Sequence, residues 1–136
     1  MSKQTFDFAV TLRCYRKSFG LDQDELAELL DVTQATISRW EAGIRAPRDP
    51  VEVLMRLYEL GDVFDDIADD VAELAMRADD GRVILTTYRG DEHWWLADER
   101  AHDMALPASM HQAATARAAR EIADDEGTFV AIRASR

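Results

Sequence analysis

Four neighbouring residues carry groups that can recognise the edges of base pairs: Gln34, Ala35, Thr36 and Arg39. A glutamine amide can donate to and accept from adenine at once, and an arginine guanidinium can donate two hydrogen bonds to guanine. The methyl groups of alanine and threonine can contact the methyl group of thymine. These contacts require a short helix that exposes the four side chains together and fits into a groove of the duplex.

Local signals in the first 61 residues predict the helices that would position this group. Asp22 and Glu25 form a capping box, and Thr33 can cap the helix that carries the four residues. We expect helices at 5–19, 23–30, 34–42 and 50–60. Gly43 and Gly61 are expected to end the third and the fourth helix. Two short helices joined by a tight turn, inside a compact helical unit, form the frame of a helix-turn-helix.

Some of these residues also have simpler interpretations. Arg39 could be a surface arginine paired with Glu41 or Asp31, and Thr36 could be a solvated helix residue. Both alternatives stay open from the sequence. Cys14 is expected to be a small buried apolar residue.

The segment GLDQDELAELLDVTQATISRWEAGIRAP, residues 20–47, resembles the Cro/CI-type (XRE family) helix-turn-helix of bacterial and phage regulators. The matching residues are Gln23, Glu25, Leu26, Ala27, Val32, Ile37, Ser38, Trp40, Glu41, Gly43 and Pro47. The resemblance covers roughly residues 5–60 and implies a lambda-repressor-like domain of four or five helices. Asp31 stands where the family often has glycine in the turn; aspartate is among the few residues that tolerate a positive φ.

The resemblance implies a role for each polar residue of this segment. The helix at 34–42 would enter the major groove and bring Gln34, Ala35, Thr36 and Arg39 to the bases. Arg16 and Glu41 match a structural ion pair that joins the first helix to the end of the recognition helix, and Ile37 and Trp40 would be core residues. Phosphate contacts are expected from Gln23, Thr33, Arg45, Arg48, Arg13 and Lys17.

Residues 62–136 predict a different, α+β architecture. In chain order we expect a helix from about 63 to 80, a strand at 82–88, a short helix at 91–97 capped by Asp91, an alanine-rich helix from Ser109 to about Asp124, and a strand at 128–133. Two isolated strands cannot make a stable sheet alone, so they are expected to pair with each other or with a second copy of the chain. The fold class is therefore mainly α with a small α+β part at the C-terminus.

The second half is expected to be the dimerising element. Helix-turn-helix domains usually bind DNA as dimers, which read two half-sites. Adjacent tryptophans cannot face the same way on a helix, so one should be in the core and the other near an interface, or over a groove of the same subunit. We expect the dimer interface to include Trp94, Trp95, Phe129 and Ile132. The order of elements also resembles the C-terminal dimerisation domain of some anti-CRISPR-associated (Aca) autoregulators.

Charge is unevenly distributed along the 136 residues, whose net charge is −11. The first 60 residues carry eight basic and ten acidic groups, whereas residues 61–136 carry eight and 17. A nearly neutral first half with clustered arginines can bind DNA through one face, while an acidic second half discourages non-specific binding. We therefore expect a DNA-binding domain at 1–61 and an acidic dimerisation domain at 62–136.

Other classes of protein are disfavoured by what the sequence lacks. The single cysteine cannot form an internal disulfide, and no signal peptide or stretch long enough to span a membrane is visible. His93, His102 and His111 do not have the spacing of a metal site, and motifs of nucleophilic catalysis are missing. We expect a protein of the bacterial or phage-infected cytoplasm that is not an enzyme, has no cofactor or metal, and has no membrane partner.

The function predicted from these patterns is a homodimeric, sequence-specific repressor that binds an inverted repeat in double-stranded DNA and regulates its own promoter. The alternative is an antitoxin-type or other interaction module, whose acidic C-terminal half binds a partner protein. A ligand-sensing regulator is a third possibility, although the second half is small for an internal pocket of the usual volume.

Overall fold

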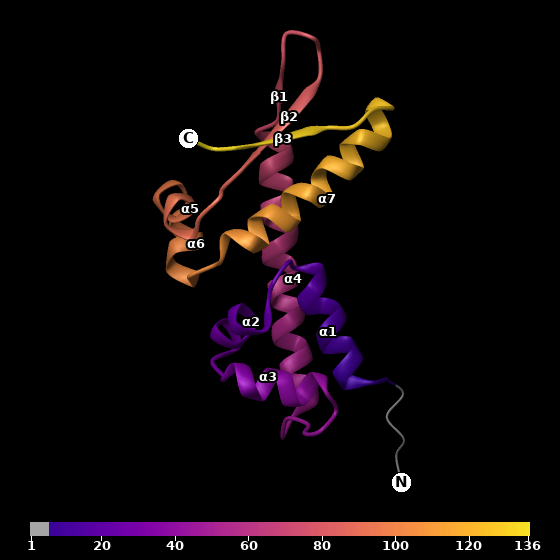
Figure 1. Ribbon diagram of the computed structural model, residues 1–136, viewed down its shortest axis with the longest axis vertical. Helices are drawn as coiled ribbons and strands as arrows, with labels where there is room; N and C mark the ends of the chain where they lie inside the picture. The colour runs from indigo at the N-terminus through magenta and orange to yellow at the C-terminus, as the bar shows by residue number, and fades with distance from the viewer. Residues whose placement is uncertain (1–5) are drawn as a thin grey trace. The chain divides into compact units, whose positions relative to one another are not determined.

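The computed structural model describes residues 6–136, so residue 5, at the start of the first predicted helix, lies outside the described residues. The chain divides into two compact units, Met1–Gly61 and Asp62–Arg136. In chain order the elements are α1 (Phe8–Ser18), α2 (Gln23–Leu30), α3 (Gln34–Glu41), α4 (Pro50–Glu73), β1 (Met76–Arg77), β2 (Val83–Thr87), α5 (Asp91–Ala97), α6 (Glu99–Met104), α7 (Ala108–Glu126) and β3 (Ala131–Ala134) (Figure 1). The chain is mainly α with a small α+β part, as predicted. None of the helices in the described part is long and apolar enough to cross a membrane.

Side-chain caps define the short helices of the first unit. The Asp22 carboxylate accepts from the Glu25 backbone at 2.7 Å, and the Glu25 carboxylate accepts from the Asp22 backbone at 2.9 Å. Asp31 ends α2 with φ 56° and ψ 46°, the left-handed conformation that the turn requires. Thr33 then caps α3 by accepting from the Thr36 backbone at 3.1 Å. The turn between α2 and α3 is therefore set by the left-handed backbone of Asp31 and by the side-chain cap of Thr33.

Each helix of the first unit contributes one fully buried aliphatic residue to a common core: Leu12, Leu26, Ile37 and Leu57. Trp40 closes the core beside Phe8, with the two rings edge to face at a centroid distance of 6.1 Å. Cys14 is exposed, which corrects the prediction that it is buried. Because side chains two positions apart on a helix point in opposite directions, Leu12 in the core directs Cys14 to the surface.

The fourth helix does not end at Gly61. It continues as α4 to Glu73. Glycine inside a helix costs about 1 kcal/mol relative to alanine. Leu57, Leu60 and Phe64 bury apolar side chains on both sides of Gly61, and their packing outweighs that cost.

The predicted extension of this helix to residue 80 is also wrong, because a strand and a turn follow Glu73. Met76 and Arg77 form β1, which pairs antiparallel with β2 in the register Met76↔Ile84. Gly81 takes a φ of 83° in the connecting turn, where a residue with a side chain would be strained. A strand of two residues is too short to show an alternating pattern in the sequence.

The strands form a sheet in the order β1-β2-β3. The two predicted strands pair with each other in parallel, in the register Ile84↔Ala131 to Thr87↔Ala134. A parallel pair needs a long crossover, which α5, α6 and α7 provide here. The last strand spans only Ala131–Ala134, later than the predicted 128–133, and it lies at the edge of the sheet.

Aspartates cap the crossover helices in a way that the sequence did not indicate. Gly90, not Asp91, is the N-cap of α5, without a side-chain hydrogen bond. The Asp91 carboxylate instead accepts from the backbone of Ala108 at 2.7 Å, at the start of α7. Asp98 caps α6, a helix that the sequence analysis did not predict. The predicted cap could not be found because Asp91 acts on a residue 17 positions away.

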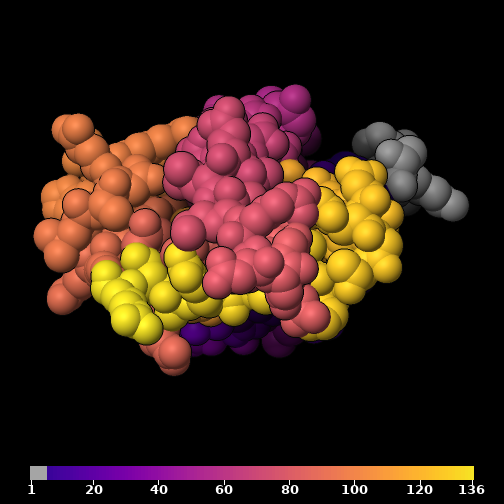
Figure 2. All heavy atoms as spheres, turned by 90° about the horizontal axis from the view of Figure 1, so that it is seen from above, coloured from indigo at the N-terminus to yellow at the C-terminus, as the bar shows by residue number. Residues whose placement is uncertain are grey.

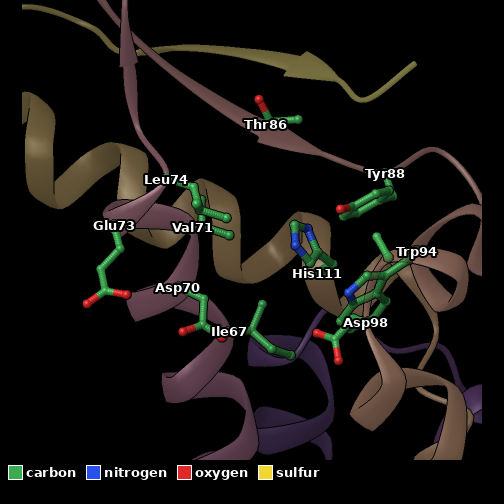
Figure 3. A pocket seen from close by; sticks show the side chains of 11 residues that line it. Ile67, Asp70, Val71, Glu73, Leu74, Thr86, Tyr88, Trp94, Asp98 and His111 are labelled. Carbon is green, nitrogen blue, oxygen red and sulfur yellow. The ribbon is translucent and has the colours of Figure 1, made fainter.

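A histidine is buried in the second unit. His111 on α7 is 7% exposed, and its Nδ1 lies 2.7 Å from the hydroxyl of Thr87 on β2. Its ring meets those of Tyr88 and Trp94 edge to face, with centroids 4.9 and 4.8 Å apart (Figure 3). Burial lowers the pKa of His111 to about 4, although the charge of Asp98 acts in the opposite direction. His111 is therefore neutral in the folded protein at neutral pH.

We expect the free energy of unfolding to fall as the pH drops from about 6.5, the ordinary histidine pKa, towards 4. In this window the unfolded chain binds a proton at residue 111 that the folded chain does not bind, so acid favours unfolding. The difference in pKa corresponds to a loss of about 3 kcal/mol. Urea unfolding at several pH values measures the slope. His111→Gln should flatten it, whereas the exposed control His102→Gln should keep it; an unchanged slope in His111→Gln contradicts the assignment.

Candidate nucleic-acid interface

The third helix has one buried and one exposed face. Ile37 and Trp40 lie in the core, as predicted. Gln34, Ala35 and Arg39 are exposed, whereas the neighbouring Thr36 is half-buried. The helix thus presents an amide, a methyl group and a guanidinium to solvent on the face away from the core.

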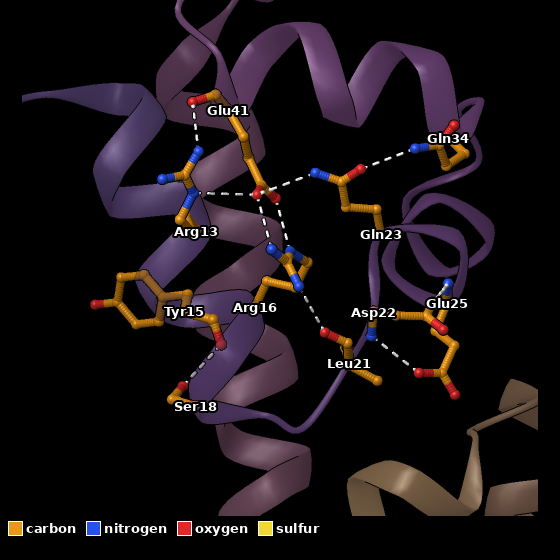
Figure 4. Close-up of polar contacts among 10 residues, drawn as sticks. All are labelled: Arg13, Tyr15, Arg16, Ser18, Leu21, Asp22, Gln23, Glu25, Gln34 and Glu41. Atoms are coloured by element: carbon orange, nitrogen blue, oxygen red, sulfur yellow. Dashed lines mark hydrogen bonds and ion pairs between the residues drawn. The ribbon is translucent and has the colours of Figure 1, made fainter.

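A buried ion pair holds this helix against α1. The Nε of Arg16 donates to one carboxylate oxygen of Glu41 at 2.7 Å, and its Nη2 donates to the other at 2.8 Å (Figure 4). Arg16 also donates from Nη1 to the carbonyl of Leu21 at 3.0 Å, just before α2. Two parallel hydrogen bonds fix the orientation of both side chains. Arg16 thereby links α1 to α3 and to the start of α2.

The ionised state of this pair is favoured by its geometry. Burial alone would raise the pKa of the Glu41 carboxyl, but the hydrogen bonds from Arg16 and Gln23 outweigh it and lower that pKa. The hydrogen bond to Glu41 in turn raises the pKa of Arg16. The stability that Glu41 contributes is therefore complete above its ordinary pKa and is lost as the pH falls through the lowered value.

A chain of amides extends from Glu41 to the exposed face. The Nε2 of Gln23 donates to Glu41 at 3.3 Å, and the Nε2 of Gln34 donates to the Oε1 of Gln23 at 2.8 Å. The direction follows from the chemistry, because an ionised carboxylate only accepts and so faces the amide nitrogen of Gln23. The carbonyl oxygen of Gln34 and its second amide hydrogen make no other contact among the described residues. Gln34 therefore keeps one acceptor and one donor available (Figure 4).

The two threonines of the turn are bonded to each other. The hydroxyls of Thr33 and Thr36 lie 2.9 Å apart, and Thr33 also caps the helix. Their hydroxyls are thus already engaged in the protein.

Most of the predicted cationic side chains are unpaired in residues 6–136. Neither a hydrogen bond nor an ion pair engages the guanidinium of Arg39, Arg45 or Arg48, or the ammonium of Lys17, and all four are exposed. The alternative that Arg39 pairs with Glu41 or Asp31 is therefore not found. Arg13 differs, because its Nε lies 3.5 Å from the carboxylate of Glu41 and its Nη2 donates to the Glu41 carbonyl at 3.3 Å.

One arginine that the sequence did not single out has a structural role. Arg56 on α4 donates to the carbonyls of Leu30 and Leu29 at 2.9 and 3.3 Å. These carbonyls at the end of α2 have no partner within their helix. No local pattern announces this contact, since the residues lie 26 and 27 positions apart.

The residues predicted for the dimer interface differ in exposure. Trp94 is 2% exposed and belongs to the core of the second unit, which corrects its assignment to a surface. Trp95 is half-buried and donates from its indole nitrogen to the carbonyl of Leu106 at 2.8 Å. Phe129 and Ile132 are exposed, and the Arg82 guanidinium covers the Phe129 ring at 4.4 Å. Of the four residues predicted for the interface, only Phe129 and Ile132 expose a large apolar surface, near the edge of the sheet.

Residues 6–136 contain no cluster of three or more His, Cys, Asp or Glu side chains placed to hold a metal ion.

Residues 12–51 match the family model described as helix-turn-helix. The match spans most of α1, all of α2 and α3, and the start of α4, and so includes Arg16, Gln23, Gln34 and Glu41. A comparison with curated proteins finds no match.

We expect Arg16→Met to lower the free energy of unfolding by about 3 kcal/mol, because it leaves the buried Glu41 carboxylate without its main partner. The double variant Arg16→Met/Glu41→Leu should lose less, since the unpaired charge is gone. Urea unfolding measures both. Lys17→Met, which removes a free cation from the same helix, should change stability by no more than about 0.5 kcal/mol. If the double variant is less stable than Arg16→Met, the interpretation that an unpaired, buried Glu41 carboxylate destabilises the fold is wrong.

Proposed function

We propose that the chain is a DNA-binding transcription regulator of the Cro/CI type and a sequence-specific repressor of its own promoter, a proposal supported by the helix-turn-helix match at residues 12–51. In this proposal two copies bind an inverted repeat in double-stranded DNA, each with α3 in the major groove. The unit Met1–Gly61 is the DNA-binding domain and Asp62–Arg136 the dimerisation domain. The protein would act in the bacterial or phage-infected cytoplasm.

The orientation of Gln34 is the observation that carries the proposal. Its amide nitrogen is held by Gln23, which is held by Glu41. The free carbonyl oxygen and the remaining N–H of Gln34 match the N6 donor and N7 acceptor of adenine. Because the side chain is ordered before DNA binds, little conformational entropy is lost on binding.

The remaining base contacts would come from the same face of α3. Arg39 has no hydrogen-bond or ion-pair partner among the described residues. Its guanidinium can therefore donate two hydrogen bonds to guanine. Ala35 is exposed at the start of the helix, where its methyl group can contact thymine. Thr36 would contribute its methyl group rather than its hydroxyl, since the hydroxyl is bonded to Thr33.

Phosphate contacts would flank the bases. Arg45 and Arg48 are free cations in the segment between α3 and α4. Lys17 and Arg13 are exposed on α1. At the starts of α2 and α3, near Gln23 and Thr33, backbone N–H groups that have no partner within the helix can face an anion.

Dimerisation would use the surface at the edge strand β3. Ile132 on this strand and Phe129 just before it are 45% and 61% exposed. Figure 2 shows the C-terminal segment, in yellow, at the surface. An edge strand presents unpaired backbone groups that a second copy can complete. Trp95 would contribute its exposed part at most, because its indole N–H is already satisfied within the chain.

We expect selection from a random duplex library at about 150 mM salt to enrich an inverted repeat, which should also occur in the chain's own promoter. Gln34→Ala and Arg39→Ala should each weaken binding by about 1–3 kcal/mol per contact and relax the preference at one position of each half-site. Selection with each variant measures this. An unchanged consensus for both variants would overturn the role of α3. No enrichment at all would favour an acidic unit that binds a partner protein.

Arg45→Ala and Arg48→Ala should weaken binding to all sequences alike. Loss of a phosphate contact makes the plot of log K against log salt shallower by about one unit per contact. Binding titrations of operator and random duplex at several salt concentrations measure the slope. The matched control is Arg120→Ala, an exposed arginine of α7, which should leave the slope unchanged. A loss confined to the operator duplex would show that these arginines read bases.

A further inference from the structure

A cavity of about 290 Å³ lies within the unit Asp62–Arg136. One wall is apolar and comes from Ile67, Val71 and Leu74, which follow one another at helical spacing along α4 (Figure 3). Tyr88 and His111 line the opposite wall of the cavity. The volume is near the lower limit of about 300 Å³ for small-molecule sites, and it suits a ligand on the order of ten non-hydrogen atoms.

Three carboxylates line this cavity: Asp70, Glu73 and Asp98. In the described part of the chain no lysine or arginine lines it. Two other acids on α4 have arginine partners, since Asp65 lies 2.6 Å from Arg117 and Asp66 lies 2.9 Å from Arg100. Asp70 and Glu73 have no such partner among residues 6–136. The cavity therefore has a negative potential that the protein itself does not neutralise.

His111 directs an unpartnered nitrogen towards this space. Thr115 donates its hydroxyl hydrogen to the His111 carbonyl at 2.8 Å, so its oxygen can only accept from Nδ1, 3.3 Å away. We therefore assign the ring proton to Nδ1, which then donates to the hydroxyls of both Thr115 and Thr87. In a neutral ring Nε2 is then an acceptor. It has no hydrogen bond in the described structure, although His111 is only 7% exposed.

Aromatic rings complete the lining. Tyr88 is half-buried and stacks on the buried Trp94 with an interplanar angle of 19° and a centroid distance of 6.4 Å. The negative face of an aromatic ring attracts a cation, and the attraction grows when the site is desolvated. Stacking holds the Tyr88 ring in place before any ligand enters.

We propose that this cavity binds a small organic cation, a protonated primary amine that carries a short apolar group. The ammonium group would lie near the carboxylates of Asp70 and Asp98 and donate one hydrogen bond to Nε2 of His111. The apolar group would lie against Val71 and Leu74. The proposal does not rest on DNA recognition, because every residue that it uses belongs to the second unit.

The test compares three probes of similar size and different charge: 2-phenylethylamine, 2-phenylethanol and phenylacetate. We expect calorimetric titration of the full chain to show the amine binding about tenfold more tightly than the alcohol, and no binding of the carboxylate. Nuclear magnetic resonance should show shifts at Tyr88 and His111. Equal binding of amine and alcohol, or no amine binding up to about 10 mM, would overturn the proposal.

Two variants test the carboxylates. Asp70→Asn and Glu73→Gln remove carboxylates that form no ion pair or side-chain hydrogen bond among residues 6–136, so the chain should keep its thermal stability. Each should weaken amine binding several-fold and leave the alcohol unchanged. Asp69→Asn is the matched control, because Asp69 is the exposed neighbour of Asp70 and does not line the cavity. Equal losses in Asp69→Asn and Asp70→Asn would mean that only the net charge matters, and would overturn the site.

Discussion

The buried carboxylate of Glu41 on α3 is the charge around which the first unit is organised. It accepts hydrogen bonds from Arg16 on α1 and Gln23 on α2, and it lies beside Arg13. A buried charge that loses its partners costs several kcal/mol, so three helices keep one relative arrangement. The orientation of Gln34, which does not contact Glu41, follows from this arrangement through Gln23.

The second unit depends on a different constraint, the parallel pairing of β2 and β3. That pairing requires a crossover, and α7 is the part of the crossover that packs against both strands. His111 and Thr115 are polar residues in the resulting core, and they satisfy each other and Thr87. Burial lowers the pKa of His111 and keeps its ring neutral, and one ring nitrogen remains for the cavity that α4 and β2 border.

Local patterns predicted the elements whose determinants are local. The capping box of Asp22 and Glu25, the left-handed turn at Asp31 and the start of α3 at Thr33 depend on residues within a few positions of each other. Gly61 was misleading, because a helix continues through glycine when the residues around it are buried. The end of α4 and the strand β1 were missed because a strand of two residues shows no alternating pattern, and the cap supplied by Asp91 was missed because it acts on a residue 17 positions away.

The sequence by itself determined the helix-turn-helix and the residues that α3 can offer to DNA, because capping, helical periodicity and side-chain chemistry are properties of neighbouring residues. Only the tertiary structure decided which of those groups are free. Gln34 is held through Gln23, Arg39 is unpaired among the described residues, and Thr36 is bonded to Thr33. The tertiary structure also places His111 in one cavity with the carboxylates of Asp70, Glu73 and Asp98. The contacts of Gln34 with Gln23 and of His111 with Thr87 join residues 11 and 24 positions apart, and packing selects them.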